Sequence, residues 1–180
     1  MNSVKAALKE RIKELTCLYE VSSILVDADP KKHLKTFRAI ADSIKVGFQY
    51  PEATEVVIKH GTYKVATGEI LNDKYLTTKI KVFDEVDGFI KVYLNDDSLD
   101  FLTEEQPLID NIGIKIGDYL DRVASKQNAA RLRQQMEHAD RLAIIGELTA
   151  GIAHELNTPL ANILGFAELL KDDLEENTAA

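Results

Sequence analysis

Residues 74–94 read KYLTTKIKVFDEVDGFIKVYL, and this stretch decides the fold class. Two runs rich in β-branched and aromatic residues, 74–83 and 88–94, flank a polar break. In the first run Leu76, Thr78, Ile80 and Val82 alternate with Thr77, Lys79, Lys81 and Phe83. Strict alternation is typical of an antiparallel strand with one covered face. The stretch therefore predicts two paired strands, with a turn at Asp87-Gly88.

Two shorter runs upstream, TEVVIKH (54–60) and TYKVAT (62–67), predict two further strands, with turns at Gly61 and Gly68. Helical patterns surround these strands. The first covers residues 4–26, where Leu8, Ile12, Leu15, Tyr19, Ser22 and Leu25 recur at three- and four-residue steps. The order helix, helix, strands, helix predicts an α+β domain whose helices cover one face of the sheet.

The second helix is expected to have Asp29 as its N-cap and Pro30 at its first position. Its expected buried stripe consists of Leu34, Phe37, Ile40, Ala41 and Ile44. A third helix restarts near Thr103, which forms a predicted capping box with Gln106. Its stripe consists of Ile109, Ile112, Ile116, Tyr119, Leu120 and Val123.

Composition limits the classes of function. The 180 residues carry a formal net charge of -8, which gives no electrostatic support to a nucleic-acid partner. A single cysteine, Cys17, excludes an internal disulfide and fits a reducing compartment. No apolar run approaches the roughly 18 residues that a membrane span needs. We therefore expect a cytoplasmic chain with no direct membrane insertion.

The third helical pattern continues toward the end of the chain and gains a seven-residue repeat. One set of positions is Leu142, Thr149, Leu156, Ile163 and Leu170, and a second set three residues on is Ile145, Ile152, Pro159 and Phe166. These are the a and d positions of a heptad pattern, called the seam below. The pattern predicts a parallel dimeric coiled coil or helical bundle. A weaker seam upstream (Leu132, Met136, Ala139, Ala143) marks a candidate switch at residues 139–145.

The segment GELTAGIAHELNTPLANILGF (146–166) places His154 at heptad position f, directly away from the seam. Thr158 lies one turn further on the same side, because residues four apart are neighbours on a helix. Pro159 removes the amide that would bond the carbonyl of Glu155, so a kink or bulge is expected there. A zinc site is excluded because the fifth residue of HELNT is Thr158 rather than a second histidine.

The stretch HADRLAIIGELTAGIAHELNTPLANILGFAELL resembles the phosphoacceptor H-box of sensor histidine kinases. The resemblance implies that His154 is the phosphorylated residue, that Glu155 orients its ring, and that Thr158 positions water for hydrolysis of the phosphorylated response regulator. Neutral imidazole, with a reference pKa near 6.5, has the nucleophilic lone pair that attack on ATP needs. The implied parent is a protein-histidine kinase of a two-component system.

The resemblance also implies parts that this chain does not carry. The sequence of this chain offers no glycine-rich nucleotide loop and no Mg²⁺ site. ATP and Mg²⁺ are therefore expected in a separate ATP-binding kinase domain. The chain alone is expected to be inactive. The expected partners are a second copy in a homodimer, the kinase domain and a response-regulator receiver domain. The domain prediction is a sensor at 1–125, a connecting helix at 126–141 and a truncated first phosphoacceptor helix at 142–180.

The order of elements and the stretch GFQYPE resemble a GAF sensor domain, with a PAS domain as the alternative. The ligand is not readable, and short strands are expected to enclose little volume. Cys17 is interpreted as a core or interface thiol, His33 and His60 as surface residues, and KVFDEV (81–86) as a strand end with solvated acids. The alternative function is a non-catalytic dimeric scaffold or ligand-binding module with a vestigial H-box.

Overall fold

The computed structural model describes residues 2–178, with side chains described for Lys5 and for residues 8–167. The chain divides into two compact units, Met1–Lys126 and Gln127–Ala180. The elements are α1 (Asn2–Val26), α2 (His33–Gly47), β1 (Thr54–His60), β2 (Tyr63–Ala66), β3 (Tyr75–Val82), β4 (Glu85–Leu94) and α3 (Glu105–Thr178).

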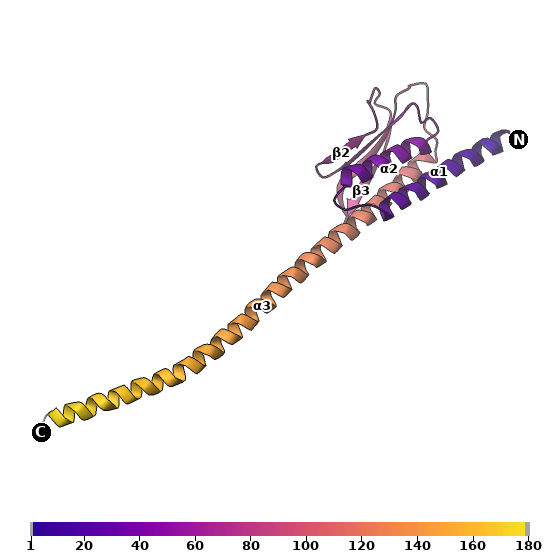
Figure 1. Cartoon of the computed structure of the whole chain (residues 1–180). Helices are drawn as coiled ribbons and strands as arrows, with labels where there is room; N and C mark the ends of the chain where they lie inside the picture. The colour runs from indigo at the N-terminus through magenta and orange to yellow at the C-terminus, as the bar shows by residue number, and fades with distance from the viewer. Residues whose placement is uncertain (1, 179–180) are drawn as a thin grey trace. The chain divides into compact units, whose positions relative to one another are not determined.

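The first unit is a four-stranded antiparallel sheet with the order β2-β1-β4-β3. Figure 1 shows α1, α2 and the first turns of α3 beside this sheet. Buried side chains from these helices meet the inward-facing residues of the strands in one core, to which Phe37, Ile58, Ile90 and Ile112 belong with no exposed surface. The other sheet face carries Lys59, Lys79 and Lys91. The predicted α+β fold, with one covered sheet face, is confirmed.

Along β3 the alternation holds as predicted: Ile80 is fully buried and its neighbours Lys79 and Lys81 are exposed. The turn is not at Asp87-Gly88, because both residues lie inside β4. It is formed by Phe83 and Asp84, whose φ angles of 50° and 63° are left-handed. KVFDEV therefore contains the end of β3 and exposed acids, as predicted, and also the turn itself.

Two glycines allow close backbone approach. A Cβ at Gly88 would lie 2.2 Å from the carbonyl oxygen of Lys59, and one at Gly117 would lie 2.4 Å from that of Lys81. The turn prediction at Gly88 is wrong because it rests on the usual association of glycine with turns. Here Gly88 serves instead the close packing of β4 on β1, and Gly117 does the same for α3 on β3.

The helix ends differ from the prediction. α2 begins at His33, and Asp29 accepts a hydrogen bond from the Lys31 amide at 3.0 Å, so Asp29 stabilises a turn before the helix rather than capping it. Leu34 is exposed, whereas the rest of the predicted α2 stripe is buried.

α3 begins at Glu105 without the predicted capping box. Gln106 donates instead to the carbonyl oxygen of Thr77 at 3.1 Å and to Asp110 at 2.9 Å. The buried carboxylate of Glu105 accepts the amides of Gln49 and Leu102, both at 2.8 Å. The predicted α3 stripe is confirmed, because Ile109 to Leu120 supply its buried members and Val123 packs against the core.

The first helix forms as predicted, but its buried face is not the one that the pattern selects. Leu8, Ile12, Leu15 and Tyr19 are exposed. Cys17, Val21 and Leu25 are buried in their place. Of the predicted stripe only Leu25 belongs to the core.

Candidate functional site

In its described residues, 127–178, the second unit is the C-terminal part of α3, and this part carries the histidine segment. His154 is exposed, and so are Glu155 and Thr158. The Thr158 hydroxyl donates a hydrogen bond to the carbonyl oxygen of His154 at 3.1 Å. The helix therefore brings His154 and Thr158 together on one face, as their spacing predicts.

Glu155 follows His154 directly, and side chains of adjacent helical residues diverge. Among the contacts of the described residues, none joins the Glu155 carboxylate to the His154 ring. The orienting role that the resemblance gives to Glu155 stays a prediction. Pro159 lies inside a helix that the structure assigns without interruption from Glu105 to Thr178.

The residues one turn before His154 are small. The histidine motif predicts no role for them. Side chains of a helix lean toward its N-terminus, so the imidazole leans over the turn that contains Ala150 and Gly151. An added Cβ at Gly151 would have nothing within 4 Å. The absence of a side chain at Gly151 leaves this side of the imidazole open.

The opposite face of this segment is apolar and uncovered. The seam residues Leu142, Ile145, Ile152, Leu156, Ile163 and Phe166 are all exposed, at 57% to 68%. Leu170 lies outside the described side chains. Leu148 at position g and Leu160 at position e widen the apolar face beyond the seam. A face this wide exceeds a two-stranded seam and is typical of a helix in a bundle.

Residues 144–180 match the family described as His Kinase A (phospho-acceptor) domain. The likeness to histidine kinases is confirmed. Sporulation kinase E of Bacillus subtilis is 35% identical over 100 residues, which are 54% of this chain and 13% of that protein. The signal transduction histidine-protein kinase AtoS of Escherichia coli is 38% identical over 58 residues, 32% of this chain and 9% of that protein. The chain thus spans a small share of the length of these histidine kinases.

Among solved structures, the A. aeolicus nlh2 GAF domain in an inactive state is similar to this chain. It is 16% identical, with a TM-score of 0.41, and the match covers 62% of this chain and 97% of that chain.

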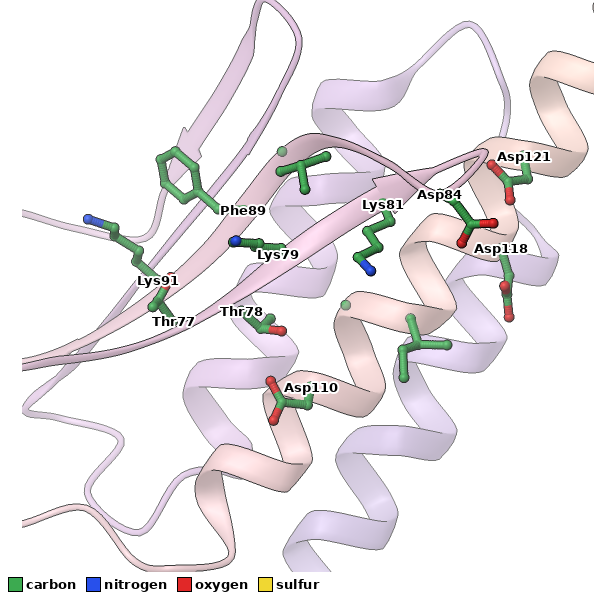
Figure 2. A pocket seen from close by; sticks show the side chains of 14 residues that line it. Thr77, Thr78, Lys79, Lys81, Asp84, Phe89, Lys91, Asp110, Asp118 and Asp121 are labelled. Atoms are coloured by element: carbon green, nitrogen blue, oxygen red, sulfur yellow. The ribbon is translucent and has the colours of Figure 1, made fainter.

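The first unit contains a large cleft, with a volume of about 790 Å³, at the edge of the sheet between β3, β4 and α3. Figure 2 shows Lys81 extending from β3 toward α3, while Phe89 and Lys91 lie on the other side of the β3–β4 hairpin. The ammonium group of Lys91 lies 4.3 Å from the centre of the Tyr75 ring. The cleft lies outside the core. It is lined by residues of β3, of β4 and of α3 rather than enclosed by the sheet.

His33 and His60 are half-buried rather than surface residues. Both rings pack on Phe37, with ring centres 6.1 Å and 5.9 Å from that of Phe37. His60 Nε2 lies 2.9 Å from a carboxylate oxygen of Asp87, whereas the Nδ1 atoms of both histidines are buried without a hydrogen-bond partner. Burial, and secondarily the nearby His60, lower the pKa of His33. Within the described residues no group of three His, Cys, Asp or Glu side chains is placed to hold a metal ion.

Cys17 lies in the core, as predicted, with 2% of its surface exposed. Burial raises the pKa of its thiol to about 11. Such a thiol is unreactive at neutral pH. In the helices of residues 2–178 no stretch is both long and apolar enough to span a membrane.

Proposed function

We propose that this chain is the sensing and phosphoacceptor part of a two-component sensor histidine kinase, and that His154 accepts the phosphoryl group. The observation that carries the proposal is the exposed His154 on the helix face opposite the apolar seam, one turn before Thr158. Burial of the seam in a dimer would leave this face free for a kinase domain and then for a receiver domain.

In the proposed reaction one ring nitrogen of His154 attacks the γ-phosphorus of ATP. The N–P bond forms as the bond from that phosphorus to the bridging oxygen breaks, and ADP leaves. The same phosphoryl group then passes to an aspartate carboxylate of a response regulator, and neutral imidazole is released. ATP and Mg²⁺ belong to a kinase domain outside residues 1–180, where Mg²⁺ would neutralise charge on the phosphates.

The chain supplies three things to this reaction. The helix holds the imidazole in place. Gly151, which has no side chain, would leave the donor's approach to the imidazole open. Thr158 lies where it would position water during dephosphorylation of the response regulator. Glu155 is proposed to orient the imidazole of His154 once a bound partner domain brings the carboxylate close to the ring. The first unit, proposed to be GAF-like, would supply the signal.

The test uses the intact protein, comprising residues 1–180 and whatever the gene encodes after them. With labelled ATP and Mg²⁺, we expect acid-labile, base-stable phosphate that is absent from His154→Ala. His138→Ala is the matched control, because His138 is also exposed on α3 and should keep the label. Phosphate of this kind retained by His154→Ala would refute the proposal and favour a scaffold with a vestigial H-box.

A further inference from the structure

The large cleft of the sensor unit has two walls of different secondary structure. One wall is formed by β3 and β4, and the other by the first turns of α3. Its volume of about 790 Å³ is that of a pocket for a drug-sized ligand. None of its lining residues belongs to the histidine segment, and all of them lie in the unit Met1–Lys126. A ligand of this cleft would therefore bind to the sensor unit alone.

Hydrogen bonds near both ends of β3 hold the two walls together. Gln106 of α3 donates to the carbonyl oxygen of Thr77 at 3.1 Å. Asp121, four turns further along α3, accepts the amide of Phe83 at 2.8 Å. Because both walls are fixed in this way, the cleft exists before a ligand binds, which lowers the cost of binding.

The packing of α3 on β3 also limits how a ligand can be recognised. β3 is an edge strand of the sheet. A Cβ added at Gly113 would lie 3.2 Å from the carbonyl oxygen of Lys79, and one at Gly117 would collide with that of Lys81. Since α3 covers this edge, a ligand cannot extend the sheet as an added strand. Side chains of the cleft must supply most of its contacts.

Charged side chains of both signs line the cleft without pairing with one another. Among the described residues, none of the ammonium groups of the cleft forms a salt bridge with a carboxylate. The charged members are Lys79, Lys81 and Lys91 of the sheet, Asp84 of the hairpin turn, and Asp110, Asp118 and Asp121 of α3. A ligand that carries charges of both signs would pair with both sets.

The charges are distributed unevenly along the cleft. Figure 2 shows Asp84, Asp118 and Asp121 gathered where the hairpin turn meets α3, called the acidic end below. Lys79 and Lys91 lie toward the opposite end, called the basic end below. A ligand with one cationic and one anionic terminus would therefore bind in one direction.

The length of the cleft identifies the size of the ligand. From Asp110 to Asp121 α3 rises by about 16 Å. An extended chain of four residues spans about 13–14 Å, whereas a single amino acid would be too short to reach both ends. Apolar side chains also line the cleft: Val86 and Ile114 are 57% and 63% exposed, and Phe89 is half-buried.

We propose that the cleft binds a short peptide of about four residues with free ends and apolar side chains. Its amino group lies at the acidic end and its carboxylate at the basic end. The bound peptide contacts α3, the helix that continues to His154. Its role as a signal rests on the proposed function, whereas its binding does not depend on phosphorylation of His154.

Calorimetric titration of the 180-residue chain with the tetrapeptide alanyl-leucyl-leucyl-alanine tests the proposal. We expect saturable binding of one peptide per chain. Acetylation of the amino end or amidation of the carboxyl end should each weaken binding by about fivefold, because each removes one charge pair. Absence of saturable binding at millimolar peptide would overturn the proposal, and so would equal binding of the free and the doubly blocked peptide. Neither result would alter the labelling test of His154.

Two variants at exposed positions assign the ends of the peptide. Asp118→Asn should weaken binding of the free peptide by about fivefold and leave that of the acetylated peptide unchanged, because the ammonium partner is already absent. Lys79→Gln should act in the same way on the free and the amidated peptide. Asp140→Asn on α3 and Lys64→Gln on β2 are the matched controls, since both positions are exposed and lie outside the cleft. Equal effects of Asp118→Asn on the free and the acetylated peptide would overturn the proposed orientation.

Discussion

The hydroxyl of Thr158 donates to the carbonyl oxygen of His154 at 3.1 Å, across one turn of α3. Thr149 makes the same bond to Ile145 at 2.7 Å. In a helix, a threonine hydroxyl either points into solvent or donates to the carbonyl oxygen four residues before it, and both threonines do the latter. With its proton donated to this carbonyl, the Thr158 hydroxyl still has lone pairs that can accept a hydrogen bond from a water molecule, as its proposed role requires.

Thr158→Ala in the intact kinase should separate the two activities. We expect labelling of His154 to stay within about twofold of wild type, because the helix keeps the imidazole in place, while dephosphorylation of the response regulator falls by at least about tenfold. Thr149→Ala removes an equivalent hydroxyl-to-carbonyl bond on the seam side of the helix and is the control. Equal loss of both activities in Thr158→Ala would indicate a structural effect on the helix.

Glu155→Gln should slow phosphorylation of His154 by about 100-fold, within the range of general acid–base effects, if the carboxylate orients the ring. The neutral amide keeps the shape of the side chain, and helicity by circular dichroism should not change. Glu147→Gln is the control, because this exposed acid lies on the same helix face as His154, one heptad before it. A rate like that of wild type in Glu155→Gln would remove Glu155 from the mechanism.

Gly151 should tolerate a small side chain and resist a large one. Gly151→Ala removes the helix penalty of glycine, about 1 kcal/mol, and adds a Cβ with nothing within 4 Å, so His154 should be labelled normally. Gly151→Leu should reduce labelling, because its side chain crowds the approach to the imidazole. Normal labelling of the leucine variant would show that the donor approaches from elsewhere.

Gly47→Ala should destabilise the sensor unit. The added Cβ would lie 2.8 Å from the Cβ of Cys17, where α2 packs against α1. Overpacking of this kind costs about 1–3 kcal/mol, which urea unfolding can measure. Gly146→Ala adds a Cβ with nothing within 4 Å and should leave the unfolding of the sensor unit unchanged.

His33 should make the sensor unit less stable in mild acid. Its pKa is lowered in the folded state, so below about pH 6.5 the unfolded chain binds this proton more readily. The free energy of unfolding should therefore fall as the pH decreases from about 6.5, and His33→Gln should reduce the fall. The rings of Phe37 and Tyr63 pack on that of His33, and the nearby His60 also acts on its charge. An unchanged pH profile in His33→Gln would assign the effect to another group.

The sequence by itself determined the elements and the histidine segment. β1 follows the run TEVVIKH residue for residue, and β3 shows the predicted alternation, because a strand with one buried face needs period-two side chains. The arrangement around His154 also depends only on local structure, since a helix places residues four apart on the same face without contacts to other elements. The spacing of His154 and Thr158 is therefore enough to place both residues on one face.

Tertiary structure decided what local patterns leave open. α1 carries two apolar stripes, and periodicity alone cannot tell which of them meets the domain; packing against α2 buries Cys17 and Val21 and leaves Leu15 and Tyr19 in solvent. Glycine at residue 88 reads as a turn but serves close strand approach, and the true turn at Phe83 and Asp84 contains no glycine. In each case the deciding energy comes from contacts between segments distant in the sequence, which no local pattern encodes.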